Sequence, residues 1–275
     1  MSSRALRAEF VEGARGRVFA LFRAPPAESR GAVLVVPPFA EEMNKARRMV
    51  TDASRALLEV GFGSVCVDLY GTGDSEGEFR DASWDVWIAD LSAAAARSTA
   101  LGMPITRILA TRLGCLLAAD YLKQNPEVPR RCVFWQPVVD GARYIDQFLR
   151  LRLAASLFGG AQKETLSGLH SQLSGAGAVE VAGYMLSSGL AQTIGARRMS
   201  DLLANAGAAI DWIDVVRSPT SGVPTASLQA VETLCAGGNS VRSLQVVGEP
   251  FWASTETVVL PELSSLTAGL LSEGA

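Results

Sequence analysis

The chain has 275 residues, of which 48% are hydrophobic and 19% are charged, and its formal net charge is −3. This composition is typical of a globular protein and excludes a disordered one, and the length suits one large domain or a domain with an insertion. The sequence contains no strongly basic stripe, so we expect no nucleic acid as its main partner.

Apolar runs, histidines and cysteines further limit the kind of protein that we expect. No apolar run approaches the ~18 residues that cross a bilayer, and the opening segment MSSRALRAEFVEG lacks the apolar core of a signal peptide. We therefore expect a cytoplasmic protein with no membrane span. His170 is the only histidine, which excludes a multi-histidine metal site, and we expect no metal and no cofactor. Four separated cysteines in apolar surroundings predict buried, reduced thiols at Cys66, Cys115, Cys132 and Cys235.

Strand and helix patterns alternate over the first 139 residues. Two β-prone runs, 8–12 and 17–23, flank the turn sequence GARG and predict a hairpin. The apolar run GAVLVVPPF predicts a central strand buried on both faces, and the spacing that follows predicts a helix over 44–60, ended by Gly61. Further strands are expected in SVCVDLY, ITRILAT and RCVFWQPVV, and further helices over 84–100 and 113–124.

The alternation stops at residue 140 and resumes at about residue 206. The runs YIDQFLRLRLAASLF and VEVAGYMLSSGLAQTI have helical spacing, which predicts a helical lid or insertion over 140–205. Strands are then expected over 210–216 and 241–247, and helices over 225–236 and 261–272. The prediction is an α/β protein: a mostly parallel central sheet with helices on both faces, its core formed by 1–139 and 206–275.

Three segments resemble the α/β-hydrolase fold. A buried strand enters a loop at PPF (37–39), where hydrolases often have His-Gly-Phe, and DLYGTGDSEG resembles the D-x-R-G-x-G-x-S loop of many esterases and lipases. In RILATRLGCLLAADYL the residues 110–114 occupy the G-x-S-x-G frame of the strained turn that carries a nucleophilic serine. The resemblance implies that Arg112 lies at the apex of this elbow.

The residues that such an elbow needs for acyl transfer are replaced. A guanidinium is always protonated and has no lone pair with which to attack a carbonyl carbon. The resemblance places an acid after the strand that follows the lid and a histidine after the last strand. The chain has RSPTSG, without a carboxylate, at the first place, and EPFW, with Phe251 or Trp252, at the second. The backbone N–H groups of Phe39 and Leu113 would form the oxyanion hole.

Arg112 allows two interpretations. A fixed cation at a helix N-terminus, beside two free N–H groups, predicts a phosphate or carboxylate site. Alternatively, Arg112 forms a structural ion pair with Glu41 or Glu42 of FAEEMNKARRM. Other strands end at the same edge of the sheet as Arg112. The side chains at those ends either pack in the core or line a pocket. The candidate ligand-binding residues are Phe39, Glu41, Asn44, Arg112, Leu113, Trp135, Gln136, Phe251 and Trp252.

Three separate segments indicate a more specific resemblance within this fold. They are PPFAEEMNKARRM, TRLG and GEPFW. They are similar to exosortase-system-associated hydrolases of the second type, which are bacterial proteins encoded with exopolysaccharide and protein-sorting loci. The leading hypothesis is a protein without the serine triad that binds a small anionic or acyl-type ligand, or a partner protein, in support of export. The alternative is a hydrolase or acyltransferase in which Arg112 binds substrate and Glu41, Glu42 or Asp74 acts as acid or base. A third is a structural subunit that pairs with a catalytic relative.

Overall fold

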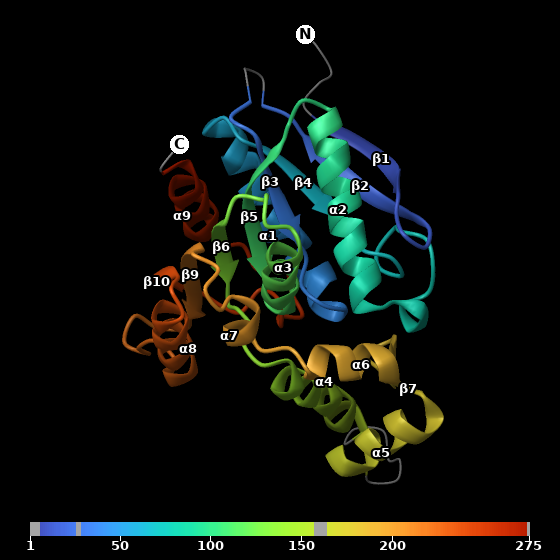
Figure 1. The fold of residues 1–275 in the computed structure, drawn as a ribbon. Coiled ribbons are helices and arrows are strands. Elements are labelled where there is room, and N and C mark those ends of the chain that lie inside the picture. Colours follow the sequence, from blue (N-terminus) through green and yellow to red (C-terminus); the bar gives the residue numbers. More distant parts are fainter. Residues whose placement is uncertain (1–5, 26–28, 157–163, 274–275) are drawn as a thin grey trace.

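The computed structural model describes residues 6–25, 29–156 and 164–273, and strands and helices alternate along them as predicted (Figure 1). In this part of the chain eight strands form one sheet, in the order β1-β2-β4-β3-β5-β6-β9-β10. β1 pairs antiparallel with β2, β2 pairs antiparallel with β4, and the remaining neighbours are parallel. The strands are β1 (Leu6–Glu12), β2 (Arg17–Arg23), β3 (Ala32–Val36), β4 (Gly63–Val67), β5 (Ile105–Thr111), β6 (Arg131–Trp135), β9 (Ala209–Val216) and β10 (Ser240–Val247).

Helices cover both faces of the sheet, which confirms the predicted fold class. Alternate residues of β3 face opposite sides: Val33 and Val35 pack on the side of α1 and α9, and Leu34 and Val36 pack on the side of α2 and α3. Every residue of α3 from Leu113 to Leu122 is buried, as its almost continuous apolar sequence predicts. The covering helices are α1 (Glu41–Glu59), α2 (Trp84–Ala100), α3 (Leu113–Gln124), α8 (Thr225–Ala236) and α9 (Pro261–Ser272).

The insertion differs from the helical expectation in one segment. It contains α4 (Gly141–Ser156), α5 (Leu166–Ala176), α6 (Ser188–Gly195) and α7 (Met199–Leu202), but residues 178–187 form an antiparallel hairpin of β7 (Ala178–Val181) and β8 (Tyr184–Ser187). The helix predicted over this stretch was wrong because Ala182 and Gly183 both have positive φ and close a two-residue turn. Figure 1 places α4, α5 and α6 beyond one end of the central sheet.

Smaller differences have local causes. α1 begins at Glu41 rather than residue 44, with both glutamates in its first turn, where a negative charge favours a helix. β6 ends at Trp135 because the next residue, Gln136, has a φ of 44° and leaves the extended conformation. The expectation of four buried thiols was wrong for Cys235, which is exposed, and for Cys66, which is partly exposed.

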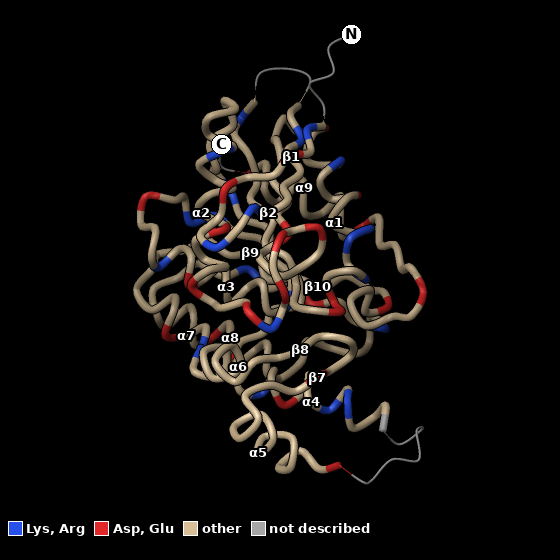
Figure 2. Tube along the Cα trace, turned by 90° about the vertical axis from the view of Figure 1, so that its right-hand side faces the viewer, with Lys and Arg blue, Asp and Glu red and all other residues tan. Residues whose placement is uncertain are grey.

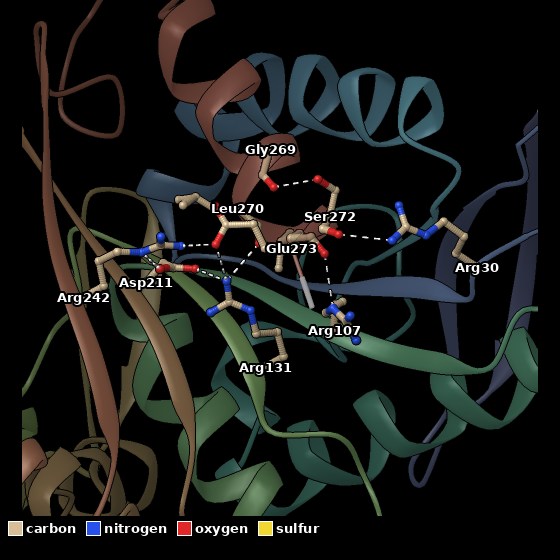
Figure 3. A network of polar contacts seen from close by, with 10 residues as sticks. Arg30, Arg107, Arg131, Asp211, Arg242, Gly269, Leu270, Ser272 and Glu273 are labelled. Atoms are coloured by element: carbon tan, nitrogen blue, oxygen red, sulfur yellow. Dashed lines mark hydrogen bonds and ion pairs between the residues drawn. The ribbon is translucent and has the colours of Figure 1, made fainter. Parts of the chain in front are cut away.

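The last turn of α9 is held by three arginines, two from strands of the sheet and one from the loop before β3. The carbonyl oxygens of a helix C-terminus lack partners inside the helix, and cations stabilise them. Here the carbonyl oxygens of Leu270, Leu271 and Ser272 each accept a hydrogen bond from an arginine, at 2.9, 3.2 and 3.1 Å. Figure 3 shows this network, whose arginine donors are Arg131, Arg107 and Arg30.

A buried carboxylate completes the same network. Asp211 is almost fully buried at the start of β9 and forms ion pairs with Arg131 at 2.7 Å and Arg242 at 2.6 Å. These residues lie near the amino ends of their strands, so this network is at the edge opposite the elbow.

Charged positions of both signs are interspersed along the described trace, as Figure 2 shows. No helix of the described residues is both long enough and apolar enough to span a lipid bilayer.

We predict that Asp211→Asn lowers the free energy of unfolding by about 3 kcal/mol, because Arg131 and Arg242 lose their buried counter-charge and keep only the exposed carboxylate of Glu273. Urea denaturation monitored by circular dichroism measures the change. Glu249→Gln is the matched control. Glu249 pairs with Arg217 on the surface, where side-chain exposures are 60% and 73%, and such pairs contribute about 1 kcal/mol or less. Equal effects of the two substitutions would contradict the role of Asp211.

Candidate functional site

Arg112 lies at the apex of the turn between β5 and α3, where the strand–turn–helix pattern of the sequence puts it. Its φ of 55° and ψ of −123° are rarely adopted by a residue with a side chain and cost roughly 1–3 kcal/mol. Gly114 allows the turn to approach the loop after β3, because a Cβ at this position would collide with the carbonyl oxygens of Pro37 and Val36. The strained backbone of a nucleophile elbow is therefore present, with a cation at its apex.

The guanidinium of Arg112 is engaged in an ion pair. Its Nε donates to Glu42 Oε1 at 3.1 Å, and its Nη1 donates to the carbonyl oxygen of Gln136 at 3.3 Å. The two side chains are only 15% and 9% exposed. Of the two glutamates that the sequence offered, Glu42 is therefore the one that pairs with Arg112.

The insertion and the loop after β10 close around this pair. Tyr144, on α4, donates its hydroxyl hydrogen to Glu42 Oε2 at 3.1 Å. The guanidinium carbon of Arg112 lies 5.8 Å from the centre of the Tyr144 ring and 5.3 Å from that of Trp252, within the range of cation–π attraction. Trp252, one of the two residues at which the resemblance expects a histidine, thus lies in contact with the elbow.

Burial perturbs the acids of this cluster. Removal from water raises the pKa of Glu42, and the neighbouring Arg112 charge opposes that rise. Because arginine stays protonated in proteins, the ionised form of Glu42 is the one that neutralises it. Burial, together with the charge of Glu42, raises the pKa of Glu41 to about 6. The Tyr144 hydroxyl, also buried, has a pKa well above its usual value and remains a hydrogen-bond donor.

A cavity of about 200 Å³ lies beside the ion pair, and we call it the elbow cavity. Its apolar lining comes mainly from α4 and from the loop after β10, and its polar lining from α1 and the elbow. The lining residues are Glu41, Glu42, Lys45, Arg112, Tyr144, Gln147, Phe148, Leu151, Trp252 and Ala253. Of the predicted ligand-binding residues, Glu41, Arg112 and Trp252 thus meet at one cavity.

The predicted oxyanion donors lie elsewhere. Phe39 and Leu113 both line a separate cavity of about 20 Å³, which has room for about one water molecule. The ring of Phe39 is buried at the centre of an aromatic cluster, in edge contact with Phe79, Trp87, Tyr144 and Phe148. Phe39 and Leu113 therefore lie outside the elbow cavity.

Other candidate residues have packing or structural contacts. Trp135 and Phe251 are fully buried against each other, with ring centres 5.8 Å apart, on the α1–α9 side of the sheet. Gln136 accepts a hydrogen bond from the backbone of Val215 at 2.8 Å. Asn44 is exposed and donates to the hydroxyl of Tyr184 at 3.3 Å. None of these four candidates lines the elbow cavity.

Asp74 and His170 are also remote from the elbow cavity. Asp74 lies in the exposed loop after β4, where its backbone N–H donates to Asp68. His170, on α5, is 46% exposed, and its Nε2 lies 2.8 Å from Asp146 of α4. The only histidine of the chain therefore contacts a carboxylate within the insertion and no nucleophile.

Neither Cys115 nor Ser75 has a basic side chain as a hydrogen-bond partner among the described residues. Cys115 is fully buried, and burial raises the pKa of its thiol well above the usual value. Ser75 holds its own loop together, accepting from the backbone of Phe19 at 2.8 Å. Across residues 6–25, 29–156 and 164–273, no group of three or more His, Cys, Asp or Glu is arranged to hold a metal ion.

Sequence reasoning missed two residues of this site. Tyr144 carries no motif, and its place in an insertion gives no indication that it reaches the elbow. Lys45 follows Glu41 by four residues on α1, a spacing that puts both on one helix face, and this spacing was the available signal.

Comparison with solved structures assigns the fold. The esterase Est1E of Butyrivibrio proteoclasticus, in complex with ferulic acid, superimposes with a TM-score of 0.73 at 14% identity, over 97% of this chain and 98% of that one. A putative hydrolase from Agrobacterium vitis gives a TM-score of 0.60 at 18% identity, over 97% of each chain. The proline iminopeptidase of Mycobacterium smegmatis gives a TM-score of 0.60 at 15% identity, over 96% of this chain and 97% of that one. No family model and no curated protein matches the chain. The chain therefore has the α/β-hydrolase fold.

We predict that Glu42→Leu lowers the free energy of unfolding by about 3–5 kcal/mol, because it leaves the Arg112 charge buried and unpaired. The double variant Glu42→Leu/Arg112→Gly regains part of this loss, since the charge is gone and glycine tolerates the positive φ. Chemical denaturation measures both. Asp52→Asn, which breaks an exposed pair with Arg48 on the same helix, is the control and changes stability by less than about 1 kcal/mol. A double variant less stable than Glu42→Leu would contradict this account.

Proposed function

We propose that this protein binds a small acyl-type ligand in the elbow cavity and forms no acyl-enzyme intermediate. The ion pair of Arg112 with Glu42 carries the proposal, because it fills the apex of the elbow with a group that cannot attack a carbonyl carbon. The segment EPFW, with Phe251 or Trp252 where the resemblance expects a histidine, supplies no general base either.

An acyl-type ligand is favoured over an anionic one. Glu42 already neutralises Arg112, so an incoming anion would compete with a carboxylate that is held by two hydrogen bonds. The apolar wall formed by Phe148, Leu151 and Trp252 offers a carbon chain a surface on which to pack.

We further propose that the protein acts in the cytoplasm, with a partner protein, in exopolysaccharide or exosortase-linked export. The resemblance of PPFAEEMNKARRM, TRLG and GEPFW to exosortase-associated hydrolases supports this role. We expect that deletion of its gene lowers the amount of cell-surface exopolysaccharide or of sorted protein, and that Arg112→Ser, being a change at the proposed site, does not fully restore it. Normal surface material in the deletion strain would contradict the role.

We predict that neither the native protein nor Arg112→Ser reacts with a fluorophosphonate probe or turns over p-nitrophenyl acetate at a rate typical of an esterase. A serine at the elbow would regain a hydroxyl but would have no base to remove its proton. Oxyanion donors and binding alone can leave ~10³–10⁴-fold catalysis over water, so a trace of turnover in the variant is expected.

Mass spectrometry of the probe-treated proteins and absorbance of released p-nitrophenol make the two measurements. Stoichiometric labelling of the native protein would refute the proposal and favour a hydrolase or acyltransferase with an unusual set of residues around Arg112. Labelling of Arg112→Ser alone would indicate an unrecognised base, and His170→Ala in that background tests the single histidine.

A further inference from the structure

The elbow cavity has room for only the end of a ligand. Its volume of about 200 Å³ is roughly ten times that of the small cavity beside Phe39, which holds about one water, so it accommodates on the order of ten water-sized groups. Drug-sized ligands occupy pockets of about 300–1,000 Å³. The ligand, or the part of it that enters, is therefore short, with a chain of about six carbons.

The charges that line the cavity cancel. Arg112 and Lys45 contribute two positive charges, and Glu41 and Glu42 contribute two negative ones. A charged ligand would gain no net attraction from this set, yet it would lose its hydration on entering. The balance favours a neutral head group.

Glu41 is the acid whose hydrogen bonds are incomplete. Both oxygens of Glu42 have partners, whereas Oε2 of Glu41 is buried and has no hydrogen-bond partner in the described residues. Lys45, one helical turn further on, forms no ion pair with it among those residues. The last torsion of a glutamate is broad, and rotation about it turns Oε2 toward the cavity. A buried acceptor without a partner is costly, and a donor on a ligand would remove that cost.

Resting on the proposed function, we propose that the elbow cavity selects a neutral acyl derivative that carries an N–H or O–H donor, such as a short primary amide. Its donor contacts the carboxylate of Glu41, and its carbon chain lies against Phe148, Leu151 and Trp252. Glu41 would then determine specificity, and Arg112 would remain paired with Glu42.

Three compounds with the same number of non-hydrogen atoms separate the effect of a hydrogen-bond donor from that of charge. They are hexanamide, methyl pentanoate and hexanoate. The first is neutral with a donor, the second is neutral without one, and the third is an anion. Titration of the Trp252 indole N–H signal by NMR, assigned with Trp252→Phe, gives the three dissociation constants. We expect hexanamide to bind about 10–100-fold more tightly than methyl pentanoate, the ratio that a hydrogen bond to a charged group provides. Hexanoate is expected to bind no better than the ester.

Variants of α1 identify the acceptor. Glu41→Leu should abolish the preference for hexanamide, and Glu41→Gln, which keeps an acceptor oxygen without the charge, should retain part of it. Glu59→Leu, the same change at the exposed end of the same helix, should leave it intact.

Each outcome tests a different statement. Equal binding of the three compounds, tighter binding of hexanoate, or a preference that survives Glu41→Leu would overturn the role of Glu41 while leaving a ligand-binding cavity. If none of the compounds shifts the Trp252 signal at tens of millimolar, binding in the cavity itself is refuted, and the proposed function fails with it.

Discussion

The ion pair between Arg112 and Glu42 joins the segments that surround the elbow. Glu42 belongs to the first turn of α1, Arg112 to the turn after β5, and Tyr144 to the insertion, and the carbonyl group of Gln136 follows β6. Removing two charges from water is costly, and the cost is recovered only when their hydrogen bonds are nearly complete. The buried pair therefore holds these four segments together at one point beside the elbow.

The backbone at the ion pair has the strained geometry of an elbow, although its side chain is an arginine. Arg112 keeps the strained backbone of an elbow, and Ala40, before α1, has nearly the same dihedral angles, with φ 50° and ψ −125°. Strain of this kind persists only where surrounding structure holds it in place, as Gly114 does by its close approach to the loop after β3. A fold can keep such a scaffold while the groups that react are replaced, because function resides in particular side chains.

Arg112 and Trp252 pack on each other and form one wall of the elbow cavity. The cavity is lined by equal numbers of positive and negative groups, and one carboxylate, that of Glu41, has an oxygen without a partner. This arrangement suits recognition of a polar, uncharged group better than the stabilisation of a developing oxyanion.

Local pattern in the sequence determined the order of strands and helices and the strand–turn–helix at Arg112, because each depends on residue types at short spacing. The hairpin at 178–187 escaped this reasoning, since the spacing of its short apolar run fits a helix as well as a strand. Only the tertiary structure decided which glutamate pairs with Arg112. Neighbouring residues of a helix point about 100° apart, so the packing of α1 directs Glu42 toward the elbow and leaves Glu41 in the cavity. Tyr144 completes the pair from 102 residues away, a contact that no local pattern encodes.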